Sequence, residues 1–262
     1  MLPDSRRREI VEQVREHDGR SVTELADRLG FSKATIRRDL RDLDAEGLIE
    51  RSHGGAVPTK TIGRERSYDQ REIRNLEAKT AIGERAAGEI DAGEIVFFDA
   101  GTTTMEAAKA ISEEQNFLAV TNSPLCALGL AEDDREVKLT GGTLRPRTRA
   151  LVGPSAEEFM ERIHVDLLFL GTNAIDAERG LMTPNEDEAR VKQLMVEHAE
   201  RVVLLADASK LGERSFVGFA DLADIDFVCT DADLDGEEGT HTQYREAFAE
   251  SGVEVVSVGG KT

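Results

Sequence analysis

The sequence has little cysteine and no long apolar run, and each shortage excludes a class of protein. Its two cysteines, Cys126 and Cys229, lie far apart and form no Cys-x-x-Cys pair, so neither a zinc site nor a disulfide framework is predicted. We expect both as small buried residues. No stretch approaches the roughly 18 apolar residues of a membrane span, and the arginines at 6–8 precede a charged segment, which is unlike a signal peptide. The sequence therefore predicts a cytoplasmic protein that contacts no membrane and holds no metal or other cofactor.

Lysine is also scarce, because only 8 of the 33 basic residues are lysine, and the net charge is −19. An acidic chain that favours arginine is typical of adaptation to concentrated salt, where charge is screened; an ordinary acidic cytosolic protein is the alternative. Residues 1–60 hold 12 basic and 12 acidic residues, so the whole excess lies in 61–262. This asymmetry predicts two parts with different partners, of which only the first could approach a polyanion.

Three amphipathic segments within residues 4–47 predict three helices. Asp4 or Ser5 is a possible cap for the first, and Thr23 is the expected cap for the second, which Gly30 should end. Ser32 should cap the third, which Gly47 should close. A short helix, a tight glycine turn and a longer helix together predict a helix-turn-helix.

The third helix has two faces. Ile36, Leu40 and Leu43 fall on one stripe and should pack inward. The opposite face collects small residues and arginines, which suits a helix in the DNA major groove, because arginine can bind guanine in a bidentate manner. Its N-terminal end is placed to contact phosphates. The alternative is a solvated charged face, since three aspartates lie on the same helix. The DNA-contacting candidates on this helix are Ser32, Lys33, Thr35, Arg37, Arg38 and Arg41.

The next stretch, LIERSHGGAVP, predicts two short strands around a turn, which together would form the wing of a winged helix. Arg51 and His53 could reach the DNA backbone or minor groove, although His53 could equally be a plain turn residue. The segment TIRRDLRDLDAEGLIERSHGGAV resembles the N-terminal signature of the DeoR/GlpR family of transcription regulators. This resemblance implies sequence-specific binding to a double-stranded DNA operator through Ser32, Thr35, Arg37 and Arg38.

Residues 57–75 are polar and charged, and they predict a hinge between domains. We expect a winged helix-turn-helix domain of α+β type at 1–57, a linker at 58–75 and an α/β domain at 76–262, in which a helix should run from about 76 to 90. The segment that holds Tyr68, Arg71, Asn75 and Lys79 is also similar to the linker of the family.

Seven short apolar runs follow, separated in several places by helical patterns: EIVFFDA, FLAVTN, EVKLTGG, VDLLFLG, RVVLLAD, DFVCTD and VEVVSVG. Continuous apolar runs suit strands that are buried on both faces, and their alternation with helices predicts an open, mostly parallel sheet. Ligands of such sheets bind beyond the carboxyl ends of the strands. Five of the predicted strands end in small, hydroxyl or charged residues, which should converge on one crevice.

The loop that follows the first run, DAGTTT, could cradle a phosphate. Gly101 allows close approach of the backbone, and Thr102, Thr103 and Thr104 begin a predicted helix whose free N–H groups favour an anion. Lys210 could supply a positive charge. The alternative is that Thr102 only caps the helix.

The stretches DAGTT, VTN, LTGG, GLMTPNEDEARVKQLM and ADASKLG are similar to the sensor half of the same family. That half is similar in fold to ribose-5-phosphate isomerase and glucosamine-6-phosphate deaminase, in which a Gly-Thr-rich loop holds the sugar phosphate. The resemblance therefore implies a phosphorylated sugar or related effector. The effector-binding candidates are Asp99, Gly101, Thr102, Thr103, Thr104, Asn122, Glu186, Lys192 and Lys210. Lys192 could instead form a salt bridge.

An enzyme is the rival interpretation. The related isomerases share an Asp-Gly-Ala-Asp stretch, and residues 171–176 here lack its leading aspartate, although Asp99 and Glu186 could substitute. An operator-binding head suits a sensor better than a catalyst. We therefore expect no catalytic residue and a regulator, most simply a repressor of sugar or glycerol catabolism genes, which works as a homodimer or homotetramer. A sugar-phosphate isomerase or deaminase with an accessory domain and a non-specific architectural DNA binder are the alternatives.

Overall fold

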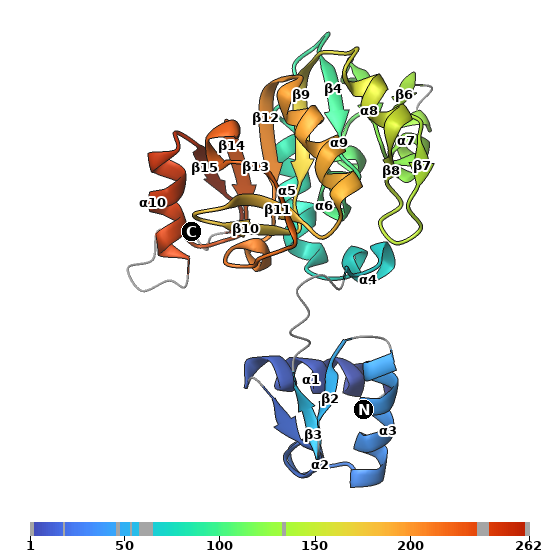
Figure 1. The fold of residues 1–262 in the computed structure, drawn as a ribbon, viewed down its shortest axis with the longest axis vertical. Helices are drawn as coiled ribbons and strands as arrows, with labels where there is room; N and C mark the ends of the chain where they lie inside the picture. Colours follow the sequence, from blue (N-terminus) through green and yellow to red (C-terminus); the bar gives the residue numbers. More distant parts are fainter. Residues whose placement is uncertain are drawn as a thin grey trace. The chain divides into compact units, whose positions relative to one another are not determined.

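The computed structural model describes residues 3–17, 19–45, 48–52, 54–57, 65–132, 135–234 and 241–259. The chain forms two compact units, one within residues 1–61 and one within 62–262, and each is described by itself (Figure 1). No helix in the described ranges is long and apolar enough to cross a membrane. Cys126 and Cys229 are both free and buried, as predicted.

The first unit is a winged helix-turn-helix. Its helices are α1 (Pro3–Glu16), α2 (Val22–Leu29) and α3 (Lys33–Ala45), and its antiparallel strands, in the order β1-β3-β2, are β1 (Arg20–Ser21), β3 (Gly55–Val57) and β2 (Glu50–Ser52). The apolar stripes of the three helices close on one core. That core includes the predicted inward residues Ile36, Leu40 and Leu43.

Two helix caps differ from the prediction. Helix α1 begins at Pro3, ahead of the expected cap, and proline suits a first helical position because it has no N–H to satisfy. Helix α2 is capped by Ser21 and not by Thr23. The Ser21 hydroxyl accepts from Glu24 N at 3.1 Å while the Glu24 carboxylate accepts from Ser21 N at 2.8 Å, and this reciprocal pair satisfies two free donors together.

The other predicted helix ends can be compared directly. Gly30 ends α2 in the left-handed conformation, at φ 71°, and Ser32 accepts from Thr35 N at 3.1 Å at the start of α3, so both predictions are confirmed. Gly47 lies outside the described residues.

The second unit is built on a seven-stranded sheet in which every pairing is parallel. In sheet order its strands are β15 (Glu254–Ser257), β14 (Phe227–Thr230), β12 (Ala199–Leu205), β9 (Val165–Gly171), β4 (Ile95–Phe98), β5 (Leu118–Thr121) and β6 (Val137–Leu139). These strands are the seven predicted apolar runs. The carboxyl ends of β4, β9 and β12, which are neighbours in the centre, meet at one edge of the sheet.

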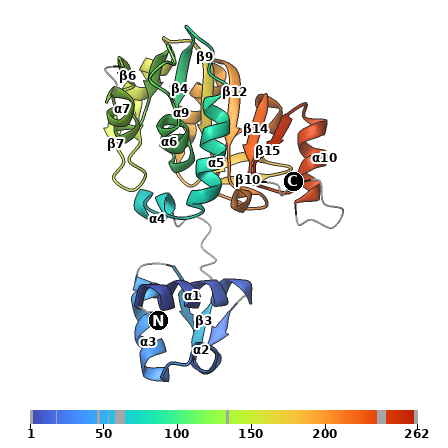
Figure 2. The same ribbon diagram turned by 180° about the vertical axis from the view of Figure 1, so that it is seen from behind.

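Helices cover both faces of this sheet (Figures 1 and 2). One face packs on α5 (Leu76–Ala87), α6 (Thr102–Lys109) and α7 (Pro124–Ala131), and the other on α8 (Pro154–Met160), α9 (Glu186–Glu197) and α10 (Thr242–Glu250). Alternate residues of β4 enter the two cores, with Phe97 in one and Val96 and Phe98 in the other. The strands from β14 to β5 are therefore buried on both faces, which explains their near-continuous apolar runs, whereas the edge strands β15 and β6 are partly exposed.

Several short elements were not predicted. They are the helix α4 (Tyr68–Glu72), the strand pair β7 (Thr143–Leu144) and β8 (Leu151–Val152), the antiparallel sheet of β10 (Ala174–Asp176), β11 (Gly180–Thr183) and β13 (Val217–Ala220), and the 3-10 turns η1 (Ala208–Lys210) and η2 (Leu222–Asp224). Helix α4 lies within the predicted linker but belongs to the second unit, because Tyr68 is buried and its N–H donates to Arg147 O at 2.7 Å. We call residues 65–75 the connector.

Candidate functional site

Helix α3 presents its predicted DNA-contacting residues to solvent. Side chains of Ser32, Lys33, Arg37, Arg38 and Arg41 are exposed, and Thr35 is half-buried. Within the described residues no ion pair engages the three arginines. They are therefore available for phosphates and base edges.

The aspartates of α3, which supported the alternative of a solvated charged face, are bound by residues of other elements. Arg6 on α1 donates to buried Asp39 at 2.6 and 3.0 Å, and Arg7 donates to Asp42 at 2.5 Å. Asp44 accepts from Arg51 N at 3.2 Å. Asp39 and Asp42 are therefore neutralised by arginines of α1 and not by the exposed arginines of α3.

The predicted wing is present as β2 and β3, which pair antiparallel. Arg51 is exposed on β2. His53, the other candidate of this segment, lies outside the described residues.

The second unit has a polar pocket at the carboxyl ends of its central strands. Its walls come from the connector, α5, the loop after β4, the end of β9, α9 and η1. Six predicted effector residues line it: Asp99, Gly101, Thr102, Thr103, Lys192 and Lys210. Asn173, Asp207 and Ser209, which were expected at this crevice as residues of the strand ends, line it too, and the lining residues that were not expected there include Arg66, Arg71, Arg74, Lys79 and Glu188.

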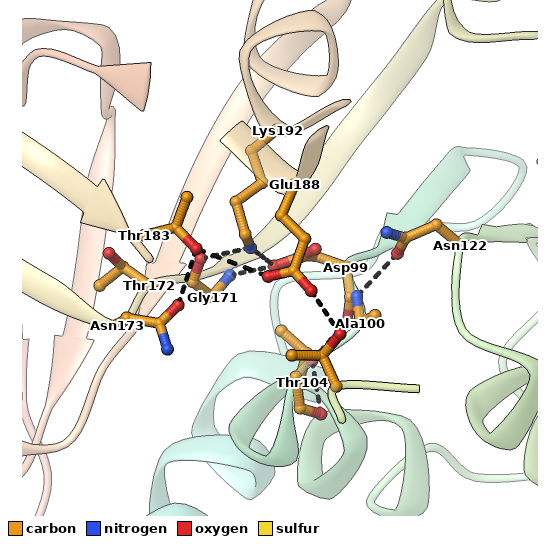
Figure 3. A network of polar contacts seen from close by, with 12 residues as sticks. Asp99, Ala100, Thr104, Asn122, Gly171, Thr172, Asn173, Thr183, Glu188 and Lys192 are labelled. Carbon is orange, nitrogen blue, oxygen red and sulfur yellow. Dashed lines mark hydrogen bonds and ion pairs between the residues drawn. The ribbon is translucent and has the colours of Figure 1, made fainter. Parts of the chain in front are cut away.

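Asp99 lies at the base of this pocket and is 1% exposed. Its Oδ2 atom accepts from Gly171 N at 2.9 Å and from the ammonium of Lys192, which also donates to Gly171 O at 2.8 Å (Figure 3). Its Oδ1 atom is buried and accepts no hydrogen bond from any described residue. A buried carboxylate oxygen without a donor is costly, so this atom is ready to accept a donor from a ligand. The salt-bridge interpretation of Lys192 is confirmed, and the same side chain also lines the pocket.

Several cationic side chains line the pocket. Burial, together with the nearby Arg71 and Arg74, lowers the pKa of Lys79 to about 8 against the opposing effect of Asp207. The pKa of Lys210 is also lowered to about 8, again chiefly by burial. Mutual repulsion among these cations would be relieved by a bound anion.

Three predicted residues do not line the pocket. Glu186 is exposed at the start of α9, because it lies about 200° around the helix from Glu188, which faces inward. Asn122 is buried and accepts from Ala100 N at 2.7 Å (Figure 3). Thr104 donates to Asp99 O at 2.6 Å. The last two therefore shape the loop that carries Asp99 and Gly101.

The cations of the connector were missed by sequence reasoning. Arg66, Arg71 and Arg74 stand in a polar, charged stretch that predicts a hinge, and of the three only Arg71 was named as similar to the family's linker. Nothing in the local pattern shows that α4 folds back to the strand ends.

Two models of known protein families match the chain. A model described as a DeoR-like helix-turn-helix domain matches residues 6–61, and one described as a DeoR C terminal sensor domain matches residues 74–232. The chain belongs to the DeoR family. It is accordingly a DNA-binding transcription regulator, with the winged helix as its DNA-binding unit and the α/β unit as its sensor domain.

Relatives in the DeoR family match over nearly the whole length. The chain is 61% identical over 98% of both chains to the "HTH-type transcriptional regulator GlpR" of Haloferax volcanii. It is 32% identical to the "Glycerol-3-phosphate regulon repressor" of Escherichia coli, over 88% of this chain and 92% of that one. A solved ribose 5-phosphate isomerase from Methanocaldococcus jannaschii matches with a TM-score of 0.40 at 15% identity, over 52% of this chain and 55% of that one.

Proposed function

We propose that the sensor unit binds a phosphorylated sugar or polyol and that its binding weakens the affinity of the winged helix for operator DNA. The genes controlled would be those of sugar or glycerol catabolism, and the regulator would repress them until the effector is present. The relatives named above as GlpR and as a glycerol-3-phosphate regulon repressor support this choice of genes and the choice of repression over activation.

The gathering of cations at the pocket carries the proposal. The unit as a whole holds the entire negative excess of the chain, yet its pocket is lined by Arg66, Arg71, Arg74, Lys79 and Lys210. Such a local reversal of charge focuses an anion. Thr102 and Thr103 at the start of α6 add N–H groups that point to the same space.

The base of the pocket supports a ligand with hydroxyl groups. Asp99 Oδ1 is a buried acceptor without a donor, and an uncharged hydroxyl meets that need without adding another charge. A pocket with cations and a buried acceptor in its lining fits a molecule with a phosphate at one end and hydroxyls at the other.

The same geometry supports sensing without turnover. A general base must be free to take a proton from its substrate, whereas Asp99 is already neutralised by Lys192 and held by Gly171 N. Glu186, the other carboxylate weighed as a substitute, is exposed and does not line the pocket.

DNA binding would use α3 in the major groove, with Lys33, Arg37, Arg38 and Arg41 toward the duplex. We propose that two chains or more assemble, so that two recognition helices meet two half-sites and the spacing of the heads sets the affinity.

The test is an operator-binding titration with the promoter region next to the protein's own gene. Binding of the protein to labelled operator DNA is followed by fluorescence anisotropy, first without any added compound and then with glycerol 3-phosphate, ribose 5-phosphate, glucosamine 6-phosphate or inorganic phosphate. At least one organic phosphate should weaken binding about tenfold, within the usual range of allosteric coupling. Equal operator affinity with every compound would refute the proposed effector class. Turnover of any of these compounds by the pure protein would favour the isomerase or deaminase interpretation instead.

A further inference from the structure

The loop between β7 and β8 holds the start of the connector. We call residues 145–149 the clamp loop. Arg145 donates to the two carboxylate oxygens of Glu65 at 3.1 and 2.9 Å, and Arg149 donates to Asp69 at 2.6 Å. The backbone joins as well, through Tyr68 N and Arg147 O at 2.7 Å. Side chains and backbone thus fix residues 65–69 to one loop.

The clamp loop is also tied to the effector pocket. Arg145 donates at 2.5 Å to Glu188, whose carboxylate lines the pocket and also accepts from Thr148 of the clamp loop. Glu188 lies one helical turn before Lys192, which pairs with Asp99 (Figure 3). The Arg145 guanidinium is therefore shared by a carboxylate of the pocket and a carboxylate of the connector.

The connector itself has two sides. Glu65, Tyr68 and Asp69 meet the clamp loop, whereas Arg66, Arg71 and Arg74 line the pocket. Within the described residues, Nε and Nη2 of Arg71 are buried without a hydrogen-bond acceptor. On the side that lines the pocket, Arg71 thus offers hydrogen-bond donors that a ligand could bind. On the side that meets the clamp loop, Glu65 and Asp69 are already paired with arginines.

We propose that the clamp loop, through the Glu65–Arg145–Glu188 bridge, transmits occupancy of the pocket to the segment that leads to the DNA-binding unit. This inference rests on the proposed function, since it assigns the route by which that same pocket acts. An anion in the pocket satisfies the connector arginines and adds negative charge beside Glu188. Arg145 is then drawn toward the pocket and its hold on Glu65 weakens.

The bridge suits this purpose because Arg145 is divided between two partners. The Glu65 and Glu188 side chains are 6% and 7% exposed, so their need for a cation is strong, and Arg145 is 21% exposed. A change of charge next to one carboxylate shifts the guanidinium away from the other. The chain passes from Glu65 towards the winged helix through residues 58–64, which lie outside the described residues.

The test uses the full-length protein with Glu65→Gln, which removes one charge of the bridge and keeps the size of the side chain. Glycerol 3-phosphate and ribose 5-phosphate serve as probes, with calorimetry for their binding and anisotropy for operator binding. Effector affinity should stay within about threefold of wild type, while the roughly tenfold effect of effector on operator affinity should fall below about twofold. Without effector, Glu65→Gln should bind the operator more weakly than wild type, because its connector is already released.

Glu158→Gln, on α8, is the matched control, since it removes an exposed ion pair with Arg162 and should leave both affinities unchanged. Asp69→Asn breaks the exposed ion pair between Asp69 and Arg149 of the clamp loop and should partly reduce the effect of effector on operator affinity. It tests the inference independently if Glu65→Gln does not fold. Full coupling in both clamp variants, together with unchanged operator affinity in the absence of effector, would overturn the inference. If neither probe binds wild type, the proposed effector class fails, and the operator affinity of the effector-free variants alone still decides for or against the clamp.

Discussion

Lys79 and Lys210 give the sensor pocket a pH dependence that can be measured. Both have pKa values lowered to about 8, chiefly by burial, so in the free protein they are largely charged at pH 7 and lose their protons as the pH rises above 8. A phosphate ester is already close to its dianion at pH 7, because its second pKa is about 6. The ligand charge therefore changes little above pH 7, and only the lysines titrate.

We expect effector affinity to be highest near pH 7 and to be at least about tenfold weaker at pH 9.5, which corresponds to about 1.4 kcal/mol. Binding at pH 8 should take up protons, because an anion raises the pKa of both lysines, and calorimetry in buffers of different ionisation enthalpy would detect this. Lys210→Arg should flatten the profile, since arginine keeps its charge. A profile in wild type that is flat between pH 7 and 9.5 would show that these ammonium groups do not contact the effector.

Arg38 tests the role of the recognition helix at the level of one residue. It is exposed on α3 and no described residue forms an ion pair with it. If it contacts a base edge, Arg38→Ala should cost about 1–3 kcal/mol of operator affinity, and random DNA should be bound almost as before. Arg162→Ala, an exposed arginine of the sensor unit, should change neither affinity. An equal loss on operator and random DNA would instead assign Arg38 to the phosphate backbone.

At the scale of elements, α1 orients the recognition helix through a buried ion pair. Arg6 donates to both oxygens of Asp39, which is 2% exposed, and the Arg6 guanidinium also lies 4.6 Å from the ring centroid of Phe31. Asp39 raises the pKa of Arg6 by hydrogen bonding. This pair joins α1 to α3.

Asp39→Asn should destabilise the winged helix by about 1.5–3 kcal/mol, the usual contribution of hydrogen bonds to charged groups. Thermal unfolding of the full chain would measure this as an earlier transition of the first unit, with the transition of the sensor unit unchanged. Asp42→Asn is the control, because Asp42 pairs with Arg7 in a more exposed position. Equal stability of the two variants would mean that the buried pair does not position α3.

Elements whose pattern is set by burial were predictable from the sequence. The central strands of the sheet have apolar runs because both of their faces meet helices, and the stripe of Ile36, Leu40 and Leu43 identified the inner face of α3. The pocket residues Asp99, Gly101, Thr102, Thr103, Lys192 and Lys210 follow from their positions at strand ends, next to strand ends or on the covering helix.

Other features depend on contacts between distant segments and leave no local pattern. Helix α4 is short and polar, and it is fixed by the clamp loop about eighty residues away in sequence. Whether Glu186 or Glu188 faces the pocket depends on how α9 is rotated about its axis, and predicting the helix alone does not fix that rotation. Asn122 and Thr104 were predicted to bind the effector, but neither lines the pocket and their side chains bond to the backbone of the loop.

At the scale of the whole molecule, the uneven charge separates the behaviour of the two units in salt. Residues 61–262 hold the full net charge of −19, while residues 1–60 are neutral. Repulsion within the acidic unit is screened over about 10 Å at 0.1 M salt and about 3 Å at 1 M. Its folded state should therefore gain stability from added salt, whereas the winged helix should gain little.

Calorimetry of the full chain in 0.1 M and 2 M potassium chloride tests this difference within one molecule. Relief of about 3 kcal/mol of repulsion in the sensor unit would raise its unfolding temperature by about 6–12 °C, at roughly 2–4 °C per kcal/mol for a unit of this size. The transition of the winged helix serves as the internal control, because a general effect of chloride on apolar surface would move both transitions together. A parallel shift of the two transitions would favour an ordinary acidic protein over one adapted to concentrated salt, while a shift confined to the sensor unit would show that its acidic surface needs screening to fold at full stability.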